Sequence, residues 1–227
     1  MEVSPQYSGI TLDAVKKNTL ANRFIDAANE YLGAVGYTEH GQRHVSLVAA
    51  MAHNTLTRLG FQDPLPELAG IAGYLHDIGN VVNRQDHGQS AALIAMRILK
   101  EMGATPDEIA IIISAIGNHE EEIGEPVNPV AAALILADKS DVHKTRVRNP
   151  DQVSVDIHDR VNYAAERSFL NVDGQKKTIS LGLTIDTKVS QVMEYFEIFI
   201  SRMIMCRRAA KFLGCTFELI INERKLI

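Results

Sequence analysis

The sequence predicts a mainly α-helical protein with a small α+β unit at its C-terminal end. Apolar residues recur at intervals of three and four through the first part of the chain, which is typical of amphipathic helices. After about residue 150 this helical period fades, and two apolar stretches flank an Asp173-Gly174 turn signal, as in a β-hairpin. We therefore expect a helical domain over residues 1–148 and a small β-β-α-β domain over residues 149–227.

The N-terminal domain divides into about six helices. Thr105-Pro106 and Asn128-Pro129 each place a capping side chain before a proline at the first helical position, and Gly60 ends a helix. Residues 1–10 are expected to form a loose leader. The expected helices cover residues 12–35, 39–59, 66–75, 87–102, 106–119 and 130–143.

The C-terminal domain is expected to contain three strands and one long helix. The strands cover residues 168–172, 178–185 and 217–222, and the helix covers residues 187–213, where Gly214 ends it. The only two cysteines, Cys206 and Cys215, lie in apolar surroundings, which favours buried thiols over a disulfide framework.

Composition excludes several classes of function. The hydrophobic content of 46% and the charged content of 22% are those of a globular protein, and no apolar run is long enough to cross a bilayer. The N-terminus lacks the basic and apolar regions of a signal peptide, so a cytoplasmic location is expected. A formal net charge of −5 argues against binding to duplex nucleic acid.

Two adjacent side chains that can bind metal, His76 and Asp77, follow the apolar run from Leu68 to Leu75. Burial of this pair is unfavourable unless another group compensates the aspartate charge, and a divalent cation would do so. The alternative is a histidine at a helix C-terminus beside a solvated aspartate. Gly79 follows two residues later, where a helix C-terminus favours glycine.

Other histidines and an aspartate lie near the ends of the expected helices. Imidazole and carboxylate groups suit Fe, Mn, Co, Ni, Zn or Mg ions. An aspartate between histidines could bridge two such ions about 3.5–4 Å apart, an arrangement used for displacement at phosphorus. The candidate residues are His40, His44, His76, Asp77, His87, His119 and Asp138.

The order His44, His76-Asp77 and Asp138 resembles the H…HD…D signature of the HD-domain superfamily of metal-dependent phosphohydrolases, over roughly residues 25–145. The resemblance implies an all-α catalytic domain whose first metal is bound by these four residues. It also places His87 and His119 where several subfamilies have ligands of a second metal, so one or two divalent ions are expected. Asn118 stands where these subfamilies often have another histidine, which leaves the second site poorer by one ligand.

The resemblance also implies catalytic roles. Asp77 is expected to orient water as well as to bind metal. His40 resembles the earlier histidine of the His-x-x-x-His arrangement in mammalian-type cyclic nucleotide phosphodiesterases, which protonates the leaving oxygen. The alternative for His40 is a residue at a helix N-terminus without a chemical role. Lys139, directly after Asp138, is expected to contact substrate.

Several basic residues are candidates for binding the phosphate groups of a substrate, because arginine can pair with phosphate through two hydrogen bonds. The alternative for each is a solvated surface charge. The candidates are Arg43, Arg84, Lys139, Lys144 and Arg146.

The resemblance thus implies a metal-dependent phosphohydrolase that uses a metal-activated water to cleave a phosphoester or phosphoanhydride of a small substrate, by analogy a nucleotide. One alternative is a regulatory, ligand-binding or dimerisation module with a weak or vestigial metal site, in which the C-terminal unit forms a homodimer or senses a ligand. Another is a nuclease for RNA or single strands, which the net charge disfavours. The Gly-Tyr-Pro signature of cyclic-di-GMP phosphodiesterases is absent.

Overall fold

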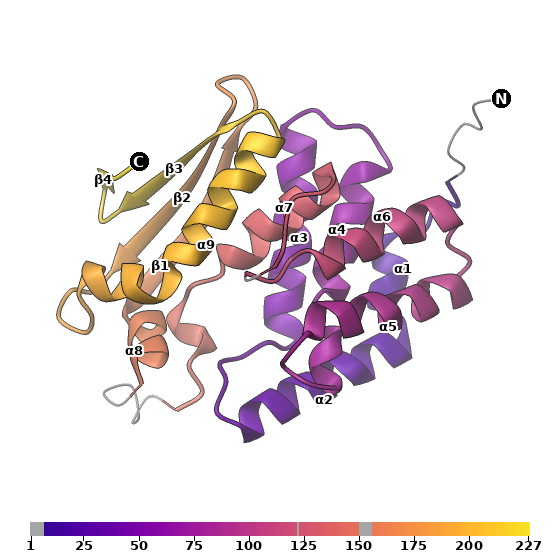
Figure 1. Ribbon diagram of the computed structural model, residues 1–227, viewed down its shortest axis with the longest axis horizontal. Coiled ribbons are helices and arrows are strands. Elements are labelled where there is room, and N and C mark those ends of the chain that lie inside the picture. The colour runs from indigo at the N-terminus through magenta and orange to yellow at the C-terminus, as the bar shows by residue number, and fades with distance from the viewer. Residues whose placement is uncertain (1–6, 122, 150–155) are drawn as a thin grey trace.

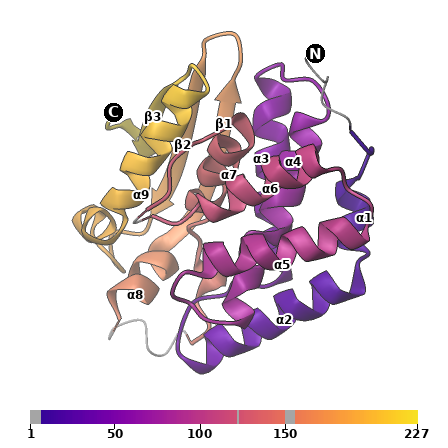
Figure 2. The ribbon, with the colours of Figure 1, turned by 45° about the vertical axis from the view of Figure 1, so that its right-hand side comes forward.

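The computed structural model describes residues 7–121, 123–149 and 156–227. Helices form one side of the molecule and a small sheet forms the other, and helix α9 packs against both helix α7 and strand β3 (Figures 1 and 2). The elements are α1 (Leu12–Lys16), α2 (Thr19–Ala34), α3 (Gln42–Arg58), α4 (Leu65–Leu75), η1 (Ile78–Val81), α5 (His87–Glu101), α6 (Pro106–Gly117), α7 (Pro129–Lys139), η2 (Lys144–Arg146), α8 (Ile157–Ala164), β1 (Ala165–Asp173), β2 (Thr178–Ile185), α9 (Val192–Phe212), β3 (Thr216–Ile221) and β4 (Arg224–Lys225).

The predicted fold class is confirmed, but several helix boundaries differ from the expected ones. The single helix expected over residues 12–35 is two helices, because the Asn18 side chain accepts a hydrogen bond from Ala21 N (2.9 Å) and starts α2 anew. The expected start near residue 39 is wrong, because Gly41 has an extended backbone and α3 begins at Gln42. The helix expected to reach residue 143 ends at Lys139.

The C-terminal part contains elements that the sequence pattern did not predict. Helix α8 precedes the first strand, and strand β4 follows the third. Helix α9 begins at Val192 rather than at residue 187, because Gln191 and Glu194 form a capping box there. Short helices in loops lack the long apolar period on which the prediction depended.

The sheet has the strand order β1-β2-β3-β4. Strands β1 and β2 form the expected antiparallel hairpin, and β3 pairs with β2 in parallel after the α9 crossover. Alternate residues of β3, from Phe217 to Ile221, are buried, so one face of the sheet packs into the interior. The sheet thereby fixes α9 against the helical part.

Two glycines allow close contacts that later bring the site together. A Cβ atom on Gly73 in α4 would lie 2.8 Å from the Ala49 Cα atom, so α3 and α4 touch backbone to backbone. A Cβ atom on Gly79 would lie 2.0 Å from the His87 carbonyl oxygen. Gly79 therefore serves the close packing of η1 on the start of α5, and the expected helix-ending role is wrong because its φ is not positive.

The described residues share one continuous apolar core. It joins Leu75 and Leu136 of the helical part to Leu181 and Phe199 of the C-terminal part. The domain boundary between residues 148 and 149 stays a prediction, and the segment 150–155 beside it lies outside the described residues.

Residues 1–6 of the expected leader also lie outside the described residues. Ser8, within the described part, donates a hydrogen bond from its backbone N and another from its hydroxyl to the buried Glu108 carboxylate (2.9 and 2.6 Å). Ser8 is therefore tied to α6 rather than loose. Within the described ranges, no helix is both long enough and apolar enough to cross a membrane.

Candidate metal centre

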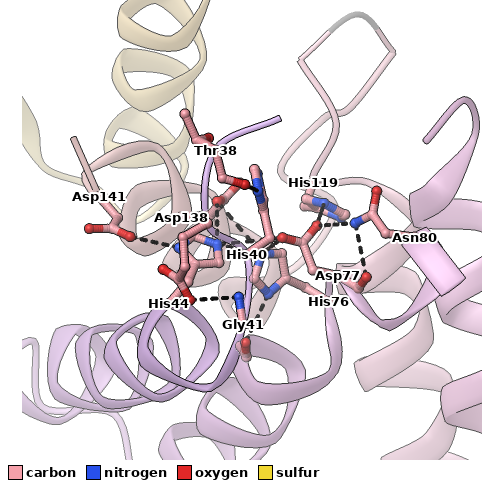
Figure 3. A network of polar contacts seen from close by, with 12 residues as sticks. Thr38, His40, Gly41, His44, His76, Asp77, Asn80, His119, Asp138 and Asp141 are labelled. Carbon is pink, nitrogen blue, oxygen red and sulfur yellow. Dashed lines mark hydrogen bonds and ion pairs between the residues drawn. The ribbon is translucent and has the colours of Figure 1, made fainter. Parts of the chain in front are cut away.

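Four of the predicted ligands converge in a first cluster, which consists of His44, His76, Asp77 and Asp138 (Figure 3). His119 also lies close enough to His76 and Asp138 to share a metal ion with them. His44 Nε2 lies 3.3 Å from His76 Nε2, 3.5 Å from Asp77 Oδ2 and 3.4 Å from Asp138 Oδ1. His76 Nε2 lies 3.4 Å from Asp77 Oδ2 and 3.6 Å from Asp138 Oδ1. The side chains come from α3, from the junction of α4 with η1, and from α7.

A second cluster consists of Asp77, His87 and His119. The other carboxylate oxygen of Asp77, Oδ1, lies 3.2 Å from His87 Nε2 and 3.9 Å from His119 Nε2. The two histidine Nε2 atoms lie 3.1 Å apart. Asp77 therefore stands between the two clusters and offers one oxygen to each.

The protonation of all four histidines is fixed by their other ring nitrogen. The Nδ1 atoms of His76, His87 and His119 contact the carbonyl oxygens of Gly73, Arg84 and Ile116 at 2.8, 3.0 and 2.6 Å. His44 Nδ1 contacts a carboxylate oxygen of Asp141 at 2.7 Å. These oxygens only accept hydrogen bonds, so each Nδ1 carries a proton and each Nε2 is the nitrogen that could bind a metal.

The arrangement fits a divalent cation in each cluster. Lone pairs that face each other at 3.3 and 3.1 Å repel one another unless a cation or a proton lies between them. Tetrahedral ligands about 2.0–2.1 Å from a metal lie about 3.3 Å apart, close to the spacing of the first cluster. The donors are imidazoles and carboxylates, which suit borderline and hard divalent ions.

The carboxylates of the first cluster are ionised at neutral pH. Burial by itself raises the pKa of Asp77, but His76 and His87 hold it well below its usual value. Burial likewise raises the pKa of Asp138, and Lys139, His44 and His76 hold it well below the usual value. Both side chains can therefore act as charged ligands.

The pKa values of His76 and His119 are shifted in opposite directions. Burial lowers the pKa of His76, but Asp77 and Asp138 outweigh it and the pKa is raised. Burial holds the pKa of His119 well below its usual value, and the charges of His76 and Lys139 lower it further. His119 is thus a neutral imidazole, the form that binds metal.

Asp141 orients the first cluster from behind, although it is not among the residues predicted from the sequence. Its carboxylate accepts hydrogen bonds from His44 Nδ1 and from Arg43 Nη2 (2.7 and 2.8 Å). Burial by itself raises the pKa of Asp141, but the hydrogen bond to His44 and the charge of Arg146 outweigh this effect and hold the pKa well below its usual value. The sequence offers only a second aspartate three residues after Asp138 as a signal, and helical spacing does not apply to it because α7 ends at Lys139.

A cavity of about 1150 Å³ opens onto both clusters. Its lining includes the predicted residues His40, Arg84, Lys139 and Arg146. Lys144 is exposed and is not brought to this lining. Arg43 is also outside the lining, since it pairs with Glu39 and Asp141.

Two of the predicted basic residues already contact the clusters. Lys139 Nζ lies 2.6 Å from Asp138 Oδ2, where its charge offsets that of the ligand. Arg84 Nη1 lies 3.3 Å from His87 Nε2, and the guanidinium group lies over the Tyr37 ring. Both side chains combine contact with a ligand and access to the cavity.

His40 lies before α3 and not on its first turn, so the helical spacing with His44 does not apply. The two rings are nevertheless neighbours, with centroids 5.4 Å apart. His40 Nδ1 contacts the Thr38 carbonyl oxygen at 2.7 Å, which leaves Nε2 as an acceptor. Burial holds the His40 pKa well below its usual value, so the ring is neutral at pH 7.

The C-terminal part forms one wall of the cavity through α8 and α9. Asn162, Phe199 and Arg202 belong to this wall. Asn162 Nδ2 donates to the His158 carbonyl oxygen (2.8 Å), and its Oδ1 has no hydrogen-bond partner within the described residues. No sequence motif marks these residues, because only the packing of α9 on α7, and of α8 on η2 and α9, brings them to the metal centre.

Comparison with known proteins is consistent with a metal centre built from these histidines and aspartates. The family model described as the HD domain matches residues 41–161, which is more than half of the chain. The chain is 28% identical over 209 residues to the uncharacterized protein MJ1020 of Methanocaldococcus jannaschii, an alignment that covers 80% of this chain and 79% of that protein. It is 32% identical over 102 residues to ribonuclease Y of Opitutus terrae, covering 45% of this chain and 18% of that enzyme.

Proposed function

The chain belongs to the HD domain family, and on this premise we propose that it is a phosphohydrolase with two divalent metal ions that acts on a nucleotide. The bond cleaved would be a phosphoester or a phosphoanhydride. The observation that carries the proposal is the position of Asp77, whose Oδ2 atom faces His44 and His76 and whose Oδ1 atom faces His87. A carboxylate so placed can bridge two ions.

When bound, such ions would neutralise charge on a phosphoryl group and lower the pKa of a coordinated water. The residues of the chain hold the ligand atoms in place before substrate arrives. Asp141 fixes the ring of His44, and main-chain carbonyl oxygens fix the rings of His76, His87 and His119. Lys139 limits the negative charge of Asp138.

His40 is our candidate for proton transfer. It lines the cavity beside the first cluster, and its neutral ring offers Nε2 as an acceptor. It can therefore orient a water or a substrate hydroxyl, and it can act as an acid toward the leaving oxygen only after it takes up a proton. Arg84, Lys139 and Arg146 lie in the same cavity and can pair with phosphate oxygens.

A nucleotide fits the size and chemistry of the cavity. Pockets for small ligands typically have volumes of about 300–1,000 Å³. The cavity here, about 1150 Å³, can enclose a phosphorylated small molecule and holds cationic side chains near the metal clusters. Asn162 and Phe199 on the opposite wall offer an amide and an aromatic ring.

The test combines metal analysis with a screen for activity. Elemental analysis of the purified protein should find up to two transition-metal or magnesium ions per chain. Phosphate release or ester cleavage should then be measured across nucleoside mono-, di- and triphosphates and cyclic nucleotides, with each candidate ion added. Metal without hydrolysis of any nucleotide would favour the regulatory alternative, and a chain that binds no metal would contradict the proposal.

An RNA phosphodiester is a second candidate substrate. The observation in its favour is the similarity to ribonuclease Y, which covers 18% of that enzyme. A net charge of −5 provides little attraction for a long polyanion. Cleavage of an end-labelled single-stranded RNA at a rate above that of every nucleotide would favour this candidate.

A further inference from the structure

Arg202 of helix α9 is a rigid cation in the wall of the cavity. Its Nε atom donates to Glu121 Oε1 (2.6 Å), and its guanidinium carbon lies 4.2 Å from the centre of the Phe199 ring. The neighbouring Ser201 hydroxyl also donates to Glu121 (2.7 Å). Across the described ranges no acceptor is placed to bind its Nη1 or Nη2 atoms.

Arg146 presents a second guanidinium group in the same cavity. Its Nε and Nη1 atoms donate to the carbonyl oxygens of Glu39 and Asp141 (3.2 and 2.8 Å), and the residue is only 4% exposed. Its Nη2 atom has no acceptor among the residues that the structure describes. Some N–H groups of each arginine thus hold the side chain in place, and the other N–H groups can donate to a ligand.

The two guanidinium groups line the same cavity. Burial lowers the pKa of Arg146, Asp141 raises it in return, and the charge of Arg202 lowers it further. Neighbouring like charges repel one another in a partly buried site, and an anion between them relieves that repulsion. The planar fork of arginine pairs with phosphate through two parallel hydrogen bonds.

We propose that Arg202 and Arg146 form a subsite for a second phosphate group of the substrate, apart from the phosphoryl group at the metal clusters. The inference rests on the proposed function and narrows its substrate to nucleotides with two or more phosphates. It also gives the C-terminal part a direct role, because helix α9 supplies a substrate-binding residue.

The same helix offers a matched control. Arg208 donates from Nη1 to Glu125 (2.8 Å). Glu125 and Glu121 both lie in the segment between α6 and α7, so the Arg208–Glu125 and Arg202–Glu121 pairs both join α9 to that segment. The Arg208 and Glu125 side chains are 57% and 59% exposed, and neither residue lines the cavity. Arg208→Gln therefore removes a helix-to-loop ion pair without touching the proposed subsite.

Binding should be measured by calorimetry on the metal-containing protein, with AMP, ADP and adenosine 3′,5′-bisphosphate as probes. The unmodified protein should bind ADP or the bisphosphate about tenfold or more tightly than AMP, since charge-assisted pairs are strong. Arg202→Gln should abolish this preference, through loss of affinity for ADP and for the bisphosphate. Arg208→Gln should keep the preference.

Glu121→Gln separates binding from positioning. This variant breaks the ion pair but keeps the Arg202 charge, so most of the preference should remain. Equal losses in Arg202→Gln and Glu121→Gln would show that Arg202 only holds the segment in place, and would overturn the subsite. Equal affinity of the unmodified protein for all three probes would also overturn it.

Hydrolysis of each probe should be assayed under the same conditions, so that binding and turnover are measured separately. Preference for two phosphates without any hydrolysis would leave the subsite standing and contradict the phosphohydrolase. Hydrolysis without a preference for two phosphates would support the phosphohydrolase and contradict the subsite.

Discussion

The two halves of the metal centre share Asp77 but are built differently. The first cluster has four ligand side chains, and a side-chain carboxylate, Asp141, holds one of its histidines. The second has three, and main-chain carbonyl oxygens hold both of its histidines. We expect the ion in the first cluster to bind more tightly, and to be more sensitive to substitutions behind its ligands.

Asn118 explains part of the difference. The resemblance to the HD superfamily places a histidine at this position in several subfamilies, but here the Asn118 amide donates to the Ser114 carbonyl oxygen (2.9 Å). It caps its own helix and does not line the cavity. The second cluster therefore gains no fourth ligand from this position.

The largest effect is expected for Asp77→Ala, which removes the shared ligand. Both ions should be lost, and hydrolysis should fall by at least about 10³-fold, because the metals supply most of the charge stabilisation. Metal content by elemental analysis and hydrolysis of the preferred nucleotide check this. The circular dichroism spectrum should stay helical, and retention of two ions would break the shared-ligand interpretation.

A second test separates the clusters by removing one ligand from each. His119→Gln should remove one ion of two, whereas His44→Gln should lower the affinity of the first cluster for its ion, which we expect to bind more tightly in the unmodified protein. Titration of the metal-free protein with Mn²⁺ or Zn²⁺ checks which binding step disappears. His53→Gln serves as the control, since His53 lies on α3 but pairs with Glu67 instead of a cluster. Loss of the same step in both ligand variants would show a single site.

A smaller effect is expected for Asp141→Asn. The amide can still meet His44 but carries no charge, so the first ion should bind about 10–100-fold more weakly. The second binding step should not change, because Asp141 contacts no ligand of the second cluster. The same titration checks this, and equal weakening of both steps would contradict the separate support of the clusters.

The smallest effect is expected for Glu120→Gln. Glu120 Oε1 lies 3.4 Å from His87 Nδ1, a longer contact than the 3.0 Å between that nitrogen and the Arg84 carbonyl oxygen. Since the main chain already fixes the ring, the affinity of the second cluster for its ion should fall by less than about tenfold. A loss as large as that of His119→Gln would make Glu120 a ligand of the second cluster.

Particular elements show how far the sequence prediction reached. The helical fold class followed from the three- and four-residue apolar period, and the hairpin from Asp173-Gly174. The predicted start of α3 was wrong, because the local backbone break at Gly41 leaves little periodic signal. Helix α8 was not predicted, because a helix of eight residues is also too short to show a clear period. Of the predicted substrate-binding residues, Arg43 and Lys144 are not brought to the cavity.

The sequence by itself determined the candidate ligand set, because imidazole and carboxylate groups in a characteristic order carry their chemistry wherever the chain places them. Only the tertiary structure decided which ligand atoms face one another. That outcome depends on backbone contacts at Gly73 and Gly79, which bring His44 to His76 and His87 to Asp77. It also placed Asp141 against His44 and Arg202 in the wall of the cavity, because contacts between distant segments depend on packing and leave no local pattern in the chain.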